Sequence, residues 1–125
     1  MRKGKIMAED LYEISMLLDF YGQLLTDSQY KCMDLHYNQD LSLSEIADEI
    51  GISRQGVHDF IKRGRAVLTE YEQKLGLMSR FCEIKKSLKN IQEDLQLIDK
   101  SEFKHGNLYM LEQIDKNLFE VITKI

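Results

Sequence analysis

Side chains that suit nucleic-acid recognition are concentrated between residues 53 and 65. Arg54 carries a guanidinium that can donate two hydrogen bonds to guanine, and Gln55 carries an amide that can pair bidentately with adenine. The cations that follow them suit phosphate contacts, which orient a protein on a duplex without reading its bases. The candidate nucleic-acid-binding residues are therefore Ser53, Arg54, Gln55, His58, Lys62, Arg63 and Arg65.

A helical projection of residues 54–68 separates these donors from an apolar face. At about 100° per residue, one half of the projection is expected in the core: Val57, Phe60, Ile61, Gly64, Val67 and Leu68. The other half is expected to be free for a partner: Arg54, Gln55, His58, Asp59, Lys62, Arg63, Arg65 and Ala66. Two residues weigh against DNA reading, because Asp59 repels phosphate and Gly56 lowers helix propensity by about 1 kcal/mol relative to alanine. A solvated charged surface, or a protein–protein contact, is the alternative for this face.

The segment before this helix has the signals of a helix-turn-helix. Ser42 and Glu45 form a capping-box pattern at the start of one helix, and Gly51 suits a left-handed cap at its end. Ser53 then suits the N-cap of the second helix, and Ala47 supplies the small residue that lets the two helices touch. The apolar residues expected to pin the two helices together are Ile46, Ile50, Ile52, Val57 and Phe60.

The distribution of charge points to the same helix. The whole chain carries a net charge of −4 and has a pI near 5.4, which disfavours indiscriminate binding to nucleic acid. From Ser53 to Arg65, however, four cations face one anion, whereas the first 52 residues hold four cations and ten acids. Positive charge is therefore concentrated on the helix that carries the donor side chains, and a dimer would double this electrostatic footprint.

The hydrophobic pattern predicts an all-α protein, because no stretch alternates like a strand between turn residues. We expect residues 1–76 to form a winged-helix-like helix-turn-helix domain. Its second helix begins with the capping-box pattern Thr26 to Gln29 and ends near Asn38, and its last helix runs to about Leu75, where Gly76 bends or ends it. Its first helix, from about residue 7 to residue 25, is expected to turn inward Leu11, Ile14, Leu17, Leu18, Tyr21 and Leu25.

The last third, residues 77–125, has the pattern of a helical hairpin and is a candidate dimerisation element. Apolar residues alternate three and four positions apart, as in a coiled coil, at Phe81, Ile84, Leu88, Ile91, Leu95 and Ile98. After a polar break at residues 100–107, a last helix presents Leu108, Leu111, Ile114 or Asp115, Leu118, Val121 or Ile122, and Ile125. These stripes either close within one chain, on each other or on the N-terminal domain, or pair two chains in a homodimer.

No residue pattern indicates catalysis or a cofactor. The sequence has no glycine-rich phosphate loop, nucleophile elbow or HExxH motif, so no catalytic residue is assigned and an enzyme is not expected. Cys32 and His36 lie four positions apart on one helix, but two ligands are too few for a metal, and packing explains Cys32 better. Two cysteines, no secretion signal and no apolar run near 18 residues indicate a cytoplasmic protein without a membrane partner.

Several motifs in order resemble the YlxM family of small bacterial proteins. They are Leu17–Thr26 followed by Gln29, Leu43–Ala47, Ser53–Val57 and Tyr71–Leu75, within a resemblance that covers about residues 8–80. The family's helix-turn-helix is similar to region 4 of sigma-70-type factors, whose second helix reads promoter DNA. The resemblance therefore implies a sigma-region-4-like domain in which Arg54, Gln55, His58 and Lys62 take the reading role.

The resemblance also implies a place in the cell for the protein. Genes of this family typically neighbour those of the signal recognition particle and its receptor, so a role in that pathway is inferred for the family. The first hypothesis is a DNA-binding regulatory protein linked to that pathway, with duplex DNA favoured over RNA and with a homodimer as the binding form. The alternative is a non-catalytic interaction module that binds a protein or the RNA of the signal recognition particle.

Overall fold

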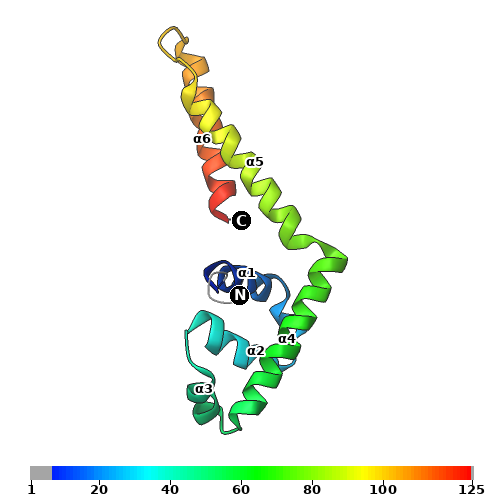
Figure 1. Ribbon diagram of the computed structural model, residues 1–125. Coiled ribbons are helices and arrows are strands. Elements are labelled where there is room, and N and C mark those ends of the chain that lie inside the picture. The colour runs from blue at the N-terminus through cyan, green and yellow to red at the C-terminus, as the bar shows by residue number, and fades with distance from the viewer. Residues whose placement is uncertain (1–6, 125) are drawn as a thin grey trace. The chain divides into compact units, whose positions relative to one another are not determined.

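The computed structural model describes residues 7–124, and every regular element in that range is helical (Figure 1). The elements are α1 (Met7–Tyr21), the 3-10 turn η1 (Gly22–Leu24), α2 (Asp27–Met33), the π-helical turn η2 (Asp34–Asn38), α3 (Leu43–Ile50), α4 (Arg54–Leu75), α5 (Leu77–Leu97) and α6 (His105–Lys124). The all-α prediction is confirmed, and within residues 7–124 no β-wing accompanies the helix-turn-helix. The chain divides into two compact units, one up to Met78 and one from Ser79 onward.

The capping signals in the sequence are formed in the structure. The Thr26 hydroxyl accepts a hydrogen bond from the Gln29 N–H, and Gln29 Oε1 accepts one from the Thr26 N–H, each at 3.2 Å. The same reciprocal pair joins Ser42 and Glu45 at 3.1 and 2.8 Å, and the Ser42 amide lowers the pKa of the Glu45 carboxyl. Gly51 ends α3 in the left-handed conformation with a φ of 78°. Side chains present in the sequence therefore set the helix boundaries around the turn.

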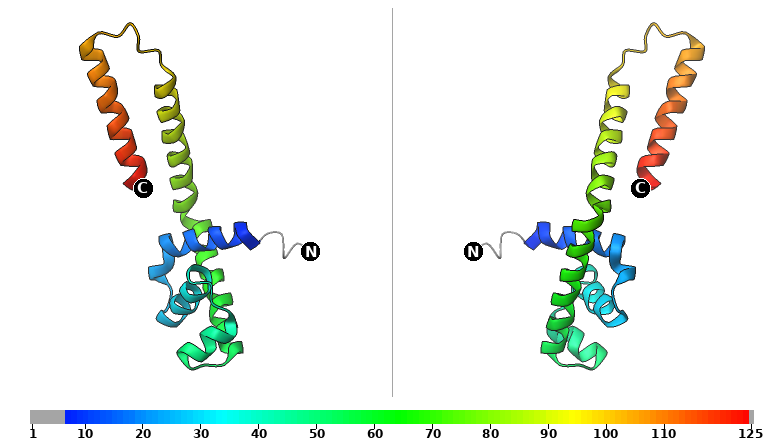
Figure 2. Two further views of the ribbon diagram at one scale, coloured as in Figure 1. Left: turned by 90° about the vertical axis from the view of Figure 1, so that its left-hand side faces the viewer. Right: turned by 90° about the vertical axis from the view of Figure 1, so that its right-hand side faces the viewer.

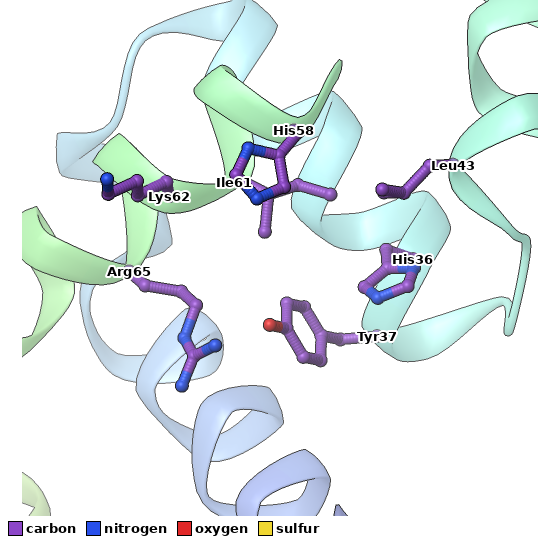
Figure 3. A pocket seen from close by; sticks show the side chains of 7 residues that line it. All are labelled: His36, Tyr37, Leu43, His58, Ile61, Lys62 and Arg65. Carbon is purple, nitrogen blue, oxygen red and sulfur yellow. The ribbon is translucent and has the colours of Figure 1, made fainter. Parts of the chain in front are cut away.

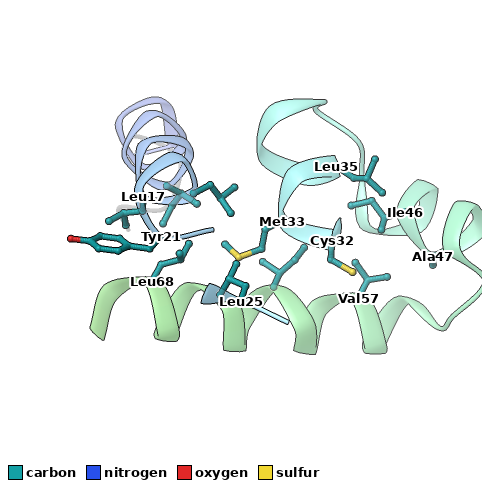
Figure 4. Close-up of a cluster of buried hydrophobic side chains, with 13 residues drawn as sticks. Leu17, Tyr21, Leu25, Cys32, Met33, Leu35, Ile46, Ala47, Val57 and Leu68 are labelled. Carbon is teal, nitrogen blue, oxygen red and sulfur yellow. The ribbon is translucent and has the colours of Figure 1, made fainter. Parts of the chain in front are cut away.

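The core of the first unit gathers side chains from α1, α2, η2, α3 and α4 (Figure 4). Its buried members are Ile14, Leu17, Leu18, Tyr21, Leu25, Cys32, Met33, Leu35, Ile46, Ala47, Val57, Ile61 and Leu68. The prediction for Leu11 was wrong, because this side chain is 40% exposed. Leu11 lies in the second turn of α1, close to the N-terminal end of this helix, which extends past α4 in Figure 2. The first helix also ends earlier than predicted, at Tyr21, and continues as the tighter turn η1.

Helices α2 and α4 approach closely at Gly64. A Cβ atom built on Gly64 would overlap Met33 Sδ and would lie 3.2 Å from Met33 Cγ. Met33 is completely buried, so it has little space into which to move. The missing side chain at Gly64 therefore sets the distance at which α2 crosses the long helix α4.

Tyr21 ties the end of the first unit together. Its hydroxyl donates to Glu72 Oε1 at 2.6 Å and accepts from the Leu77 N–H at 3.1 Å, while Glu72 Oε1 also accepts from the Met78 N–H at 3.1 Å. The Tyr21 ring stacks on Tyr71 with centroids 6.0 Å apart. Burial, followed by the hydrogen bond with Glu72, raises the pKa of the Tyr21 phenol. Two of the orphan amides at the start of α5 are thus satisfied by side chains from α1 and α4.

The second unit consists of α5 from Ser79 onward and α6, which run antiparallel on either side of a loop (Figure 2). Of the residues that the structure describes in this unit, only Leu111 and Ile122, both on α6, are buried. Where the sequence left two choices on α6, the structure turns Asp115 and Ile122 inward, and Ile114 and Val121 are about half exposed. Residue 125, which completed the predicted stripe, lies outside the described residues.

The apolar residues of the predicted seam, from Phe81 to Ile98, divide into two rows within the single chain. Leu88 and Leu95 are partly covered, together with the polar side chains of Lys85 and Gln92. Ile84, Ile91 and Ile98 are instead 51%, 48% and 40% exposed. A straight α-helix turns by about 100° per residue, so a stripe of residues three and four positions apart drifts slowly around the helix axis. One straight antiparallel neighbour therefore covers only part of that stripe, whereas a supercoiled partner would cover all of it. Each helix of the hairpin consequently keeps an uncovered aliphatic row.

Candidate nucleic-acid interface

The first four turns of α4 separate into a buried face and an exposed face, as the helical projection predicted. Val57, Ile61, Gly64 and Leu68 are buried, and Phe60 and Val67 pack partly against the core. The exposed side chains are Arg54, Gln55, His58, Asp59, Lys62, Arg63, Arg65 and Ala66. Ser53 differs from the rest of the predicted set, because its hydroxyl accepts the Gly56 N–H at 2.9 Å as the N-cap of α4.

The turn that precedes α4 departs from the sequence prediction at one residue. Ile52 was expected to pin the two helices together, but its side chain is 37% exposed. It follows the left-handed Gly51 and lies beside Gly56, where an added Cβ would come within 3.5 Å of Ile52 Cδ1 and 3.2 Å of Ser53 Oγ. The absence of a side chain at Gly56 therefore makes room for the cap and for Ile52 at the start of the helix.

Four cations of α4 point outward without a partner. Within residues 7–124, Arg54, Lys62, Arg63 and Arg65 make no hydrogen bond or ion pair, whereas Lys74 near the end of the helix pairs with Glu70 at 3.2 Å. Exposed cations that are not neutralised by neighbouring carboxylates are available to phosphate groups. Three of them, Arg54, Lys62 and Arg65, share one strip along the helix, and Arg63 lies further around the helix axis.

A polar contact links three residues on the same surface. Gln55 Nε2 donates a hydrogen bond to Asp59 Oδ1 at 3.1 Å, one helical turn further on. The same carboxylate oxygen lies 3.8 Å from His58 Nδ1. Asp59, which is unfavourable for phosphate binding, is therefore hydrogen-bonded to the amide of Gln55, which is predicted to read a base.

A cleft of about 300 Å³ opens beside this helix (Figure 3). It is lined by His36, Tyr37, Leu43, His58, Ile61, Lys62 and Arg65, so three of the predicted binding residues form one of its walls. His36 and Tyr37 come from η2 and form the facing wall, with the Tyr37 hydroxyl directed across toward the side of Arg65. The predicted binding residues do not include these two, because α3 separates them from α4 in the sequence and no local motif connects them.

His36 is held in place by its surroundings. Its Nδ1 lies 2.8 Å from the Leu41 carbonyl oxygen, which makes Nδ1–H the donor, and its ring meets the Tyr37 ring edge-on with centroids 4.9 Å apart. Cys32, one turn earlier, is instead completely buried, and burial raises the pKa of its thiol. Among the described residues, no three His, Cys, Asp or Glu side chains group as metal ligands do.

Comparison with known proteins places this arrangement in a family. The family model described as "UPF0122: Putative helix-turn-helix protein, YlxM / p13 like" matches residues 8–119. A UPF0122 protein of Acetivibrio thermocellus is 44% identical over 114 residues, which cover 91% of this chain and 97% of that protein. UPF0122 proteins of Thermoanaerobacter sp. and Halalkalibacterium halodurans are 38% and 40% identical, over 92% and 87% of this chain and 98% and 97% of their own lengths. No helix between residues 7 and 124 combines the length and apolarity needed to cross a bilayer. The chain belongs to the YlxM / p13-like helix-turn-helix family.

Proposed function

Starting from membership of a helix-turn-helix family, we propose that this chain is a cytoplasmic regulatory protein that binds duplex DNA through the exposed face of α4. The observation that carries the proposal is a group of four cations on that face that have no partner among residues 7–124, in a chain whose net charge is −4. Arg54 and Gln55 lie in the first turn of α4, which is where recognition helices contact base edges. Lys62, Arg63 and Arg65 lie further along, where they suit the phosphate backbone.

The regulated process in this proposal is the signal recognition particle pathway, on the strength of the family resemblance. A second candidate is a non-catalytic module that binds a protein or the RNA of that particle. Asp59 favours it, because a carboxylate on the reading face is unfavourable near DNA phosphates but is compatible with a mixed-charge protein surface. A-form RNA would be met through shape and phosphates rather than through base edges.

Fluorescence anisotropy with three labelled nucleic acids distinguishes these candidates. The purified chain is titrated against duplex DNA from upstream of its own operon, a random duplex of the same length, and signal recognition particle RNA, each at two salt concentrations. Preferential binding to the upstream duplex that weakens with salt supports the DNA-binding regulator. Binding to the RNA alone, or to no nucleic acid, contradicts it and favours the interaction module.

The hairpin supports a homodimer as the binding form. The uncovered row on one side of the hairpin loop consists of Ile84, Ile91 and Ile98, and the row on α6 consists of Ile114 and Val121. In both helices the uncovered row is rotated away from the covered row in the same direction about the helix axis. Because the two helices run antiparallel, both uncovered rows project on the same side of the hairpin. A hairpin in which two of the described side chains are buried has too small a core to be stable alone. A second copy presents the same aliphatic face, and two hairpins packed face to face make a four-helix bundle.

Sedimentation equilibrium tests this assembly with a matched pair of variants. Ile91→Asp places a charge in the middle of the proposed interface and is expected to give monomers. Leu97→Asp introduces the same charge on the same helix at a side chain that is 82% exposed, so it is expected to stay dimeric. A monomeric unmodified chain, or a dimer that survives Ile91→Asp, would contradict a dimer formed through these rows.

A further inference from the structure

We propose that the cleft between η2 and α4 is a phosphate site, and that it grips one phosphodiester of the nucleic-acid backbone between Arg65 and His36. The inference rests on the proposed binding of nucleic acid by α4. It adds a second element to the interface, since η2 contributes the facing wall (Figure 3). It also assigns a role to residues that neither the helix-turn-helix motif nor the charge distribution identifies.

The composition of the lining fits an anion. His36, His58, Lys62 and Arg65 bring four nitrogen-bearing side chains to the cleft, and none of its seven lining residues is a carboxylate. Lys62 and Arg65 make no ion pair within the described residues. Asp59 does not line the cleft; its Oδ1 accepts from Gln55 and lies 3.8 Å from Nδ1 of His58. Because a guanidinium can donate two parallel hydrogen bonds, Arg65 suits two oxygens of a single phosphate.

Two apolar side chains complete the lining of the cleft. They are Ile61, which is buried, and Leu43, which is half-buried, so one side of a bound phosphate would face apolar atoms rather than water. Attraction between charges is greater beside apolar atoms than on a fully solvated surface. A phosphate here is therefore bound more strongly than one that meets an isolated cation such as Arg63.

The orientation of His36 determines how it meets the phosphate. Since Nδ1–H donates to the Leu41 carbonyl, Nε2 is the nitrogen left for the cleft, and it has no hydrogen-bond partner among the described residues. Nε2 donates to a phosphate oxygen only when the ring is an imidazolium. The ring does not need to turn, because the hydrogen bond to Leu41 and the edge-on contact with Tyr37 already fix it.

A double-mutant cycle tests whether His36 and Arg65 share one phosphate. Affinity for a labelled duplex is measured by anisotropy at pH 6 for the full chain, His36→Gln, Arg65→Gln and the double variant. We expect each single change to weaken binding about tenfold and the double change to weaken it by much less than the product of the two. The matched cycle pairs His36→Gln with Arg63→Gln, whose side chain does not line the cleft, and there the factors should multiply.

A second arm separates the source of the phosphate from the site itself. Inorganic phosphate and a mononucleotide are titrated while the imidazole signals of His36 and His58 are followed by NMR. Shifts that saturate and disappear in Arg65→Gln support a phosphate site without any DNA. If the chain binds no duplex but these shifts remain, the site holds a small phosphate compound and the proposed function fails. If the chain binds duplex, the cycle multiplies and no shifts occur, the phosphate site is overturned while DNA binding stands.

Discussion

Gln55 and Asp59 form a hydrogen-bonded pair on the outer face of α4, with Gln55 Nε2 and Asp59 Oδ1 3.1 Å apart. The pair joins the residue best suited to reading adenine to the residue least suited to DNA. Because the carboxylate fixes the amide one turn away, Asp59 orients Gln55 before any duplex arrives. The unfavourable charge and the orientation are therefore two effects of the same side chain, and substitutions can separate them.

Asp59→Asn removes the charge of this side chain and keeps the oxygen that accepts from Gln55. We expect affinity for every duplex to rise about threefold, because one negative charge near the phosphates is lost. Asp59→Ala removes both charge and acceptor, so it should raise affinity similarly but reduce the preference for the best sequence. Titration of both variants against a preferred and a random duplex checks this. Equal base preference in the two variants would show that Asp59 does not position Gln55.

Arg54 and Lys62 are expected to contribute in different ways. Arg54→Ala should cost about 1–3 kcal/mol on the preferred duplex and relax base preference, because a base-edge contact is lost. Lys62→Ala should weaken all sequences alike and reduce the slope of log affinity against log salt by about 1. Lys74→Ala is the control, since Lys74 already pairs with Glu70 at the far end of the same helix. Equal losses for Arg54→Ala and Lys62→Ala on every duplex would contradict base reading by Arg54.

Gly64→Ala is expected to destabilise the first unit. The new methyl group overlaps the completely buried Met33, and overpacking of this kind costs about 1–3 kcal/mol. The gain in helix propensity returns about 1 kcal/mol, so a net loss of about 1 kcal/mol should appear in urea unfolding. Gly106→Ala is the matched control, because a Cβ there meets nothing within 4 Å and should not destabilise α6. A Gly64→Ala variant that is more stable than the parent would mean that Met33 repacks freely.

Tyr21→Phe should destabilise the first unit by about 1–3 kcal/mol, because the Leu77 N–H loses its acceptor and Glu72 loses a donor. The phenol pKa is raised above its ordinary value of 10.0 in the folded chain. The protonated Tyr21 phenol therefore makes its full contribution to the free energy of unfolding below about pH 10. This contribution is lost as the pH rises toward the folded pKa, because the unfolded chain releases the proton first. Urea unfolding between pH 8 and pH 11 should show a shallower alkaline loss in Tyr21→Phe than in the parent. Parallel curves would contradict this, because the buried Cys32 thiol is common to both proteins.

The local parts of the fold could be predicted because each depends on neighbours in sequence. The caps at Thr26, Ser42 and Ser53 and the left-handed Gly51 follow from side chains within three residues of the backbone groups they satisfy. The two faces of α4 follow from its periodicity alone. The reading face could therefore be named residue by residue from the sequence.

The remaining features depend on contacts that periodicity does not encode. The cleft needs η2 and α4 on either side of it, and their relative position is set by the packing of α2 on α4 at Gly64. Whether Ile84 or Lys85 turns toward α6 depends on the rotation of α5 in the pair, and spacings of three and four allow either. The exposure of Leu11 likewise depends on how far the neighbouring helices extend, which its own spacing cannot reveal.

The π-helical turn η2 makes the number of residues between α2 and α3 a feature that can be compared among relatives. A turn of this kind accommodates one residue more than an α-helical turn, and everything beyond that residue is rotated by about 100°. A relative with one residue fewer between Met33 and Asn38 would close an ordinary turn and swing the positions equivalent to His36 and Tyr37 away from α4. A single deletion in this stretch would thus abolish the cleft in a lineage while leaving every residue of the recognition helix unchanged.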